Sequence, residues 1–244
     1  MNFNVKKLKT LNECQNCDLS YADLQGADLR GADLKGAYLR GVNLEGALLT
    51  NASLENAIIE SADLNDVDME GANLEGVRLV FTKISYANLK YVNLKNSECT
   101  LAFFFESNLE GADLNGANLA KAGLAKINLV GATLKGATLN GVDFDGANLI
   151  NTDFTDANLK GVDLSFSNLQ GANLTNANVK DANLKSANLS NALLIKSNLV
   201  GSNFLCANLE EANLTNAYLE EARLEESKLK RANFSNAKLR GANF

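Results

Sequence analysis

Residues 22–46 read ADLQG-ADLRG-ADLKG-AYLRG-VNLEG, five successive units with one shared pattern. Each unit has a small residue first, Leu third and Gly fifth. Outward from this stretch, the third position stays apolar at every fifth residue from Leu19 to Phe244, which makes 46 consecutive positions in one register. Leu occupies 35 of these positions and Phe six. A repeat that fills the chain decides the architecture before any single element does.

A period of five residues fits neither a helix nor a continuous strand. Five helical residues turn the side chain by about 500°, so successive leucines would wander around a helix instead of forming a stripe. In a continuous strand, alternate leucines would point to opposite faces, because the side chains of a strand repeat every two residues. The pattern therefore predicts very short extended pieces separated by bends. The central Leu and the small residue two positions before it should both point inward.

The residue two positions after each central residue predicts how many units complete one turn. This position holds 17 of the 18 glycines, with Gly123 as the exception, and eight asparagines. When the units are sorted into four classes, all eight asparagines fall in two of them. Asn and Gly are the residues that tolerate a positive φ. We therefore expect four units per turn, with a left-handed residue required at two of the four corners and not at the other two.

The A-(D/N)-L-x-x unit resembles the repeat of the pentapeptide repeat family over residues 14–244. The resemblance implies an all-β fold, a right-handed quadrilateral β-helix, which is a square solenoid with Leu and Phe inside. The 46 units then make about 11.5 turns and, at a strand spacing of about 4.8 Å, a rod roughly 55 Å long. Residues 1–13 lack the repeat. There, Val5, Leu8 and Leu11 recur in a short segment, which we expect to be a helical cap over the open end of the core.

Composition excludes several classes of function. The chain of 244 residues has no His, Pro or Trp, which removes histidine-based catalysis, imidazole metal sites and histidine pH switches. A net charge of −6 without clustered Lys or Arg argues against direct binding of nucleic acid. No uninterrupted apolar run of about 18 residues is present, so no membrane-spanning segment is expected, and the first ten residues do not read as a secretory signal. Four Cys are too few for a disulfide scaffold, and we expect a cytoplasmic protein.

No group of residues predicts catalysis, a metal site or a cofactor. Asp residues before the central position, such as Asp18, interchange with Asn throughout, which a general acid could not do and a hydrogen bond within a turn could. Cys14 and Cys17 form a C-x-x-C with no second pair, so zinc is not expected. Both fall on inward positions, either as buried thiols or as a disulfide at the cap, a bridge that pentapeptide proteins with a similar pair can carry. Cys99 is a core position, and Cys206 should be exposed and free.

The first unusual surface feature is an acidic patch. The stretch from Gly41 to Gly76 contains no Lys or Arg. Six of its carboxylates should project from the rod: Glu45, Glu55, Glu60, Asp66, Glu70 and Glu75. Lys90 and Lys95 follow Glu70 and Glu75 by one predicted turn and should blunt the field of this patch.

The second feature is an aromatic patch in the middle of the rod, which is the candidate site for a partner. It consists of Val80, Phe81, Tyr86, Leu101, Phe103 and Phe105. Exposed apolar patches often mark interaction sites, and aromatic residues are favoured anchors. Alternatively, the rings of Phe103 and Phe105 lie over Gly123 and Ala125, one predicted turn further on, and shield the backbone.

We interpret the chain as a non-enzymatic scaffold that binds an unidentified protein partner, with no nucleic acid or membrane as a direct partner. The alternative is a DNA-mimicking modulator of DNA gyrase, as some members of the family are. Those relatives have a strongly acidic surface, a largely Phe-centred core and a C-terminal dimerisation helix, whereas this chain is Leu-centred, mildly acidic and stops at Phe244 inside the repeat. There we expect either end-to-end homodimerisation through Ala222–Phe244 or fraying of the last turn, because its edge has no following strand.

Overall fold

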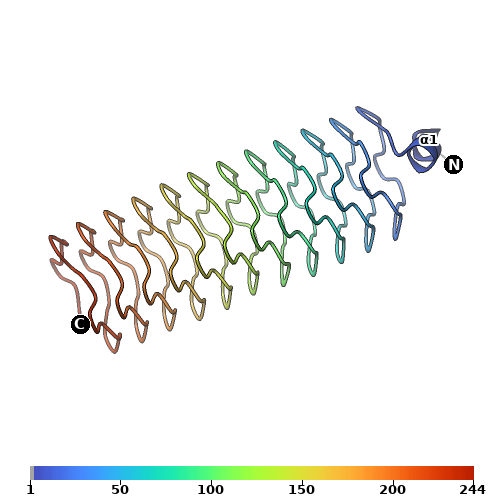
Figure 1. Cartoon of the computed structure of the whole chain (residues 1–244). Coiled ribbons are helices and arrows are strands. Elements are labelled where there is room, and N and C mark those ends of the chain that lie inside the picture. Colours follow the sequence, from blue (N-terminus) through green and yellow to red (C-terminus); the bar gives the residue numbers. More distant parts are fainter. Residues whose placement is uncertain (1–2) are drawn as a thin grey trace.

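The computed structural model describes residues 3–244 as one short helix followed by a long stack of similar coils (Figure 1). Helix α1, Phe3–Leu11, lies at the blue, N-terminal end of the stack. After it, every β-element of the described chain is a single bridge residue, so no longer strand forms in residues 12–244. The short extended pieces separated by bends are those that the five-residue period predicts.

Parallel bridges join the residue before each central position to the residue 20 positions further on. The series runs from Glu13 with Asp33 to Arg223 with Asn243 without a change of register. Backbone hydrogen bonds connect consecutive coils in the same register; for example, the N–H of Leu134 donates to the carbonyl of Asp153 at 2.7 Å. Four units therefore complete one coil, and units that lie 20 residues apart stack to form one face of the solenoid.

The interior is a ladder of central side chains. From Leu19 to Leu224 every central residue is at most 2% exposed, and most of the small residues two positions earlier are buried with them. In the last coil Leu229, Phe234 and Leu239 are only partly buried. Because each coil packs only on its neighbours, stability is spread along the rod and is lowest at its ends.

Helix α1 caps the first coil with Val5 and Leu8, which are 7% and 1% exposed. Leu11, expected on the same side, is instead 59% exposed. A spacing of three residues advances a helix by about 300°, so the third member of the series lies about 120° round from the first. Cys14 and Cys17 at the first bend are joined by a disulfide, with their Cα atoms 5.2 Å apart. At nine residues, the helix of the described chain is far too short to span a bilayer.

All bends have the same backbone conformation. The residue two positions after each central residue has a positive φ, between 53° and 73°, along the whole solenoid. The prediction that only two of four corners need a left-handed residue is therefore wrong. Almost every bend is closed by the same hydrogen bond, such as that from the N–H of Ala27 to the carbonyl of Leu24 at 3.0 Å, and a turn of this kind can require φ > 0 at its third residue. Bulky residues such as Phe81 and Leu101 accept this conformation at a cost of about 1–2 kcal/mol.

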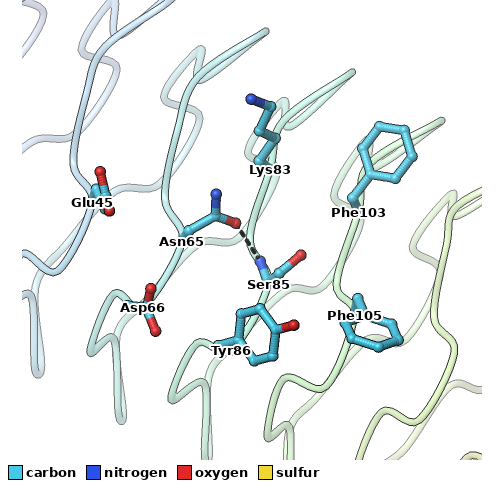
Figure 2. A pocket seen from close by; sticks show the side chains of 8 residues that line it. All are labelled: Glu45, Asn65, Asp66, Lys83, Ser85, Tyr86, Phe103 and Phe105. Carbon is cyan, nitrogen blue, oxygen red and sulfur yellow. Dashed lines mark hydrogen bonds between the residues drawn. The ribbon is translucent and has the colours of Figure 1, made fainter.

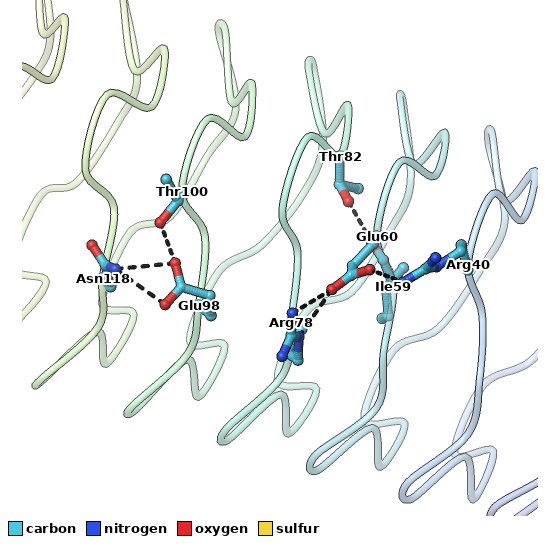
Figure 3. Close-up of polar contacts among 8 residues, drawn as sticks. All are labelled: Arg40, Ile59, Glu60, Arg78, Thr82, Glu98, Thr100 and Asn118. Carbon is cyan, nitrogen blue, oxygen red and sulfur yellow. Dashed lines mark hydrogen bonds and ion pairs between the residues drawn. The ribbon is translucent and has the colours of Figure 1, made fainter.

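Buried hydroxyl groups repair the two bends in residues 3–244 that lack the closing hydrogen bond. These bends follow Ile59 and Ile84. The free carbonyl of Ile59 accepts a hydrogen bond from the hydroxyl of Thr82 in the next coil (Figure 3). The free carbonyl of Ile84 accepts one from the hydroxyl of Ser107. Thr82 and Ser107 are themselves buried. Their hydroxyls thus explain why Thr and Ser stand at positions where Ala is usual.

Candidate functional site

The Asp and Asn side chains before the central residues stabilise the bends by accepting hydrogen bonds from the backbone. Oδ1 of Asp18 accepts a hydrogen bond from the N–H of Ser20 at 2.9 Å, and Oδ1 of Asn128 accepts one from the N–H of Val130 at 3.3 Å. The bond from Ser20 lowers the pKa of Asp18. Since Asp and Asn offer the same acceptor oxygen, they interchange along the repeat. No cluster of three or more potential metal ligands occurs in the residues that the structure describes.

Neither free cysteine carries an activated thiol. Cys99 lies in the core, where burial raises its pKa to about 12. Cys206 is exposed, and its thiol donates to the carboxylate of Glu226 at 3.2 Å, a contact that raises its pKa. Because the thiolate is the nucleophilic form, both thiols are weak nucleophiles at neutral pH.

The aromatic patch covers two bends and the face between them. Phe81 and Leu101 lie one coil apart on the first bend, and Tyr86 lies on the second. Phe81 and Tyr86 are each 56% exposed, and Phe103 on the face between them is 52% exposed. The ring of Tyr86 meets that of Phe105 edge-on, with centroids 5.7 Å apart. Four of the six predicted residues thus present aromatic rings on one side of the rod.

In the structure, the ring of Phe103 both packs on the next coil and remains exposed to solvent. Phe103 leans on the next coil, since a Cβ atom on Gly123 would lie 3.5 Å from its Cδ1 atom. Despite this contact, more than half of Phe103 remains exposed. Phe105 and Val80 are half-buried. Phe103 therefore packs on the next coil and still offers an apolar surface to solvent.

A shallow groove of about 490 Å³ lies on the same face (Figure 2). The rings of Tyr86, Phe103 and Phe105 line one end of it, and the carboxylates of Glu45 and Asp66 line the other. The groove thus joins part of the aromatic patch to part of the acidic patch, although the two patches come from different stretches of the sequence.

Three further residues of the groove were missed by sequence reasoning. Asn65, Lys83 and Ser85 lie on the face beside Asp66 and Tyr86, and Oδ1 of Asn65 accepts a hydrogen bond from the N–H of Ser85 at 2.9 Å (Figure 2). The 20-residue register contains the signal for them. Glu45, Asn65, Ser85 and Phe105 follow one another at this spacing and form one column.

The other members of the acidic patch lie on different faces of the rod. Glu55 and Glu75 share a face, because they are 20 residues apart, whereas Glu60 and Glu70 lie on two further faces. Glu60 is held between Arg40 and Arg78, with 2.6 Å between its Oε1 atom and Nη2 of Arg78 (Figure 3).

Lysines partly neutralise the remaining carboxylates of the patch. Nζ of Lys35 lies 3.4 Å from Oε1 of Glu55. Lys90 and Lys95, expected to act on Glu70 and Glu75, instead form ion pairs in the following coil, with Glu110 at 3.1 Å and Asp113 at 3.0 Å. Each lysine has a carboxylate on both sides along the rod and takes the later one.

The Glu60 cluster predicts a pH-dependent contribution to stability. Burial raises the pKa of Glu60, but Arg78 and Arg40 outweigh it, so the pKa lies below its usual value of 4.5. A lowered pKa stabilises the fold above about pH 4.5, and this contribution disappears as the pH falls through the lowered value. Glu60→Gln should therefore reduce the free energy of unfolding by about 1 kcal/mol at pH 7, because both arginines are largely exposed, and by less below pH 4.5.

Urea unfolding between pH 3 and pH 7 measures this effect. Glu45→Gln is the matched control, because Glu45 accepts a hydrogen bond from Gln25 and forms no ion pair within residues 3–244. A constant difference between Glu60→Gln and the unmodified protein at all these pH values would contradict the assignment.

Comparison with known proteins places the repeat in a family. A family model described as pentapeptide repeats matches the chain over residues 13–51, 37–76, 62–98, 82–120, 127–165, 167–204 and 207–244. The chain belongs to the pentapeptide repeat family. The resemblance inferred from the A-(D/N)-L-x-x unit is thereby confirmed. No curated protein sequence matches this pentapeptide-repeat chain.

Solved structures of other pentapeptide repeat proteins are similar to this one. HetL from Nostoc sp. strain PCC 7120, involved in the regulation of heterocyst differentiation, is 28% identical over 99% of this chain and 96% of its own, with a TM-score of 0.41. Rfr23 from Cyanothece 51142 is 27% identical over 55% of this chain and 91% of its own, with a TM-score of 0.41. The plasmid-mediated fluoroquinolone resistance protein QnrB1 is 18% identical over 76% of this chain and 81% of its own, with a TM-score of 0.36.

Proposed function

We propose that this pentapeptide repeat protein is a non-enzymatic scaffold that binds a protein partner through the aromatic patch. The observation that carries the proposal is the exposure of large apolar side chains on two neighbouring bends and the face between them: Phe81, Tyr86 and Phe103 are each more than half exposed. Exposed apolar side chains grouped in this way often mark an interaction site. Aromatic anchors also contribute a large share of the binding energy at protein interfaces.

The backbone conformation at the bends also favours the aromatic patch as the binding surface. Phe81, Tyr86 and Leu101 all have a φ of 59°, a conformation that is costly for bulky side chains. At other bends the ring has a packing role, since Tyr21 and Tyr91 lie over the glycines of the next coil, Gly41 and Gly111. Phe81 is followed at that distance by Leu101 and Tyr86 by Glu106, so these two side chains lie on no such glycine. For Phe81 and Tyr86, contact with a partner would offset part of the cost of this conformation.

We also propose that the solenoid winds in a right-handed sense, with a square cross-section and about 11.5 turns, and that the protein is cytoplasmic. Homodimerisation through Ala222–Phe244 stays a prediction. Modulation of gyrase is the weaker alternative, because duplex mimicry needs carboxylates along one surface, whereas the acidic patch is spread over the faces of the rod and Glu55 and Glu60 are ion-paired.

Phe81→Gly tests the proposal by separating binding from stability. Glycine relieves the left-handed strain, so the free energy of unfolding should rise by about 1 kcal/mol while partner binding falls. Phe166→Gly is the matched control, because Phe166 is also an exposed bend residue, 63% exposed with a φ of 55°, but lies four coils beyond Tyr86.

Quantitative affinity capture from cell extract, paired with thermal unfolding, provides the measurement. Proteins captured by the unmodified chain and by Phe166→Gly, but lost with Phe81→Gly, support the proposal. The triple variant Phe81→Ser, Phe103→Ser and Phe105→Ser should lose the same proteins. If that variant keeps every captured protein and only unfolds more readily, the aromatic patch has a packing role and the proposal is wrong.

A further inference from the structure

The negative charge of the chain is concentrated in the coils that form the groove. Residues 41–120 contain 12 Asp and Glu against 4 Lys and Arg, which is a net charge of −8, while the whole chain carries −6. The rest of the chain is therefore slightly positive, by +2. A potential of this sign attracts a cationic partner and repels nucleic acid.

The two carboxylates in the groove are available to a ligand. Within residues 3–244, the side chain of Asp66 has no hydrogen bond and no ion pair, and Glu45 accepts one hydrogen bond, from Nε2 of Gln25 at 3.0 Å. Lys83, the cation that lines the groove, has its Nζ atom 3.8 Å from Asp63, and its ammonium group lies on the opposite side of the face from Asp66 and Tyr86 (Figure 2). No cation of the described chain therefore neutralises Asp66.

An aromatic ring stands next to this free carboxylate. Asp66 and Tyr86 occupy the same bend in consecutive coils, so their backbones are about 4.8 Å apart. A guanidinium group can therefore form an ion pair with Asp66 and stack on Tyr86 at the same time, which a single ammonium group does less well. The neighbouring ring already accepts a cation, since Nζ of Lys126 lies 5.2 Å from the centroid of Phe105.

The shape of the groove suits an extended segment. The column Glu45, Asn65, Ser85 and Phe105 crosses four coils, which corresponds to about 14 Å along the rod. An extended peptide places side chains on one side about 6.8 Å apart. One basic side chain can then lie between Asp66 and Tyr86 while the next side chain on that side reaches the rings of Phe103 and Phe105.

We propose that the groove binds an extended, arginine-containing segment of the protein partner, with arginine between Asp66 and Tyr86 and an apolar side chain against Phe103 and Phe105. This inference rests on the proposed function and names the chemistry of its partner. It also explains why the aromatic and acidic residues share one face although they come from different parts of the repeat array.

Titration of fluorescent peptides tests the inference. The probe is an eight-residue peptide, acetylated and amidated, in which Arg and Leu alternate with Ser; matched peptides carry Lys or Gln in place of Arg. Binding should be tightest for Arg, weaker for Lys and weakest for Gln, and it should weaken between 50 and 300 mM NaCl. Asp66→Asn should weaken binding of the Arg peptide about three- to fivefold and remove most of its advantage over the Gln peptide.

Asp156→Asn is the control for net charge, because Asp156 is an exposed bend residue far from the groove. It should bind the Arg peptide as the unmodified protein does. Equal binding of the Arg and Gln peptides, no binding of either, or an unchanged affinity in Asp66→Asn would overturn the inference. The proposed function is judged separately, because Phe81 lies outside the groove and Phe81→Gly can lose the partner whatever the peptides do.

Discussion

Leu134→Asp is expected to lower the free energy of unfolding by about 5 kcal/mol, the largest effect of any single substitution considered for this protein. Leu134 is fully buried, and its neighbours one coil before and after are the equally buried Leu114 and Phe154. A carboxylate at this position has no cation or water to solvate it. Its side chain also leaves part of the leucine volume empty, which adds the cost of a cavity.

Two control variants distinguish the cost of burying a charge from the cost of changing any side chain in the ladder of central residues. Leu134→Met keeps the volume and should cost less than about 1.5 kcal/mol. Leu229→Asp places the same carboxylate at a partly buried central position and should cost much less than Leu134→Asp. Urea unfolding followed by circular dichroism, with hydrogen exchange to locate the opening, provides the measurement. A stability of Leu134→Asp within 1 kcal/mol of the unmodified protein would contradict the buried ladder of central residues.

The ladder could be predicted from the sequence because it depends only on the period. An apolar residue at every fifth position from Leu19 to Phe244 leaves one arrangement in which all of them point inward, and the structure has that arrangement up to the exposed Phe244. The helical cap could be predicted from Val5 and Leu8 for the same reason. Leu11 is exposed instead of buried, because positions spaced by three residues drift around a helix. A one-dimensional pattern thus predicts burial well.

The backbone conformation of the bends could not be predicted in the same way. The residue types found at a bend reflect the energetic cost of a positive φ there, but they do not show whether the backbone adopts it. Gly and Asn concentrate at two of the four bends, yet all four have the same φ. The left-handed conformation costs a bulky residue only about 1–2 kcal/mol, which a well-packed rod can tolerate. Phe81, Tyr86 and Leu101 therefore occupy a conformation that their residue types disfavour.

The candidate site depends on contacts between coils, and the sequence predicts only some of these contacts. The 20-residue register could have placed Asn65 and Ser85 in one column with Glu45 and Phe105. It could not show that Lys90 turns toward Glu110 and away from Glu70, since both carboxylates lie one coil away. The direction of a long side chain depends on its rotamer, and that choice has no periodic signal.

Gly41→Ala should lower the free energy of unfolding by about 2 kcal/mol, the second largest effect. Gly41 has a φ of +63°, so an added Cβ atom alone is unfavourable there. The new atom would also lie 2.6 Å from Cδ1 and Cε1 of Tyr21, closer than side chains approach one another. The ring of Tyr21 would have to leave the bend of the next coil, and its packing would be lost.

Gly131→Ala isolates the backbone part of this cost. Gly131 has a φ of +66°, and nothing lies within 4 Å of its added Cβ atom, so the loss there should be about 1 kcal/mol. The ring part is isolated by a double-mutant cycle with Tyr21→Ala, in which Gly41→Ala should cost no more than Gly131→Ala. Thermal and urea unfolding of the four variants measure both parts. If Gly41→Ala costs the same with and without the ring of Tyr21, then side chains do not pack from bend to bend along the rod, and the bends are coupled only through the backbone.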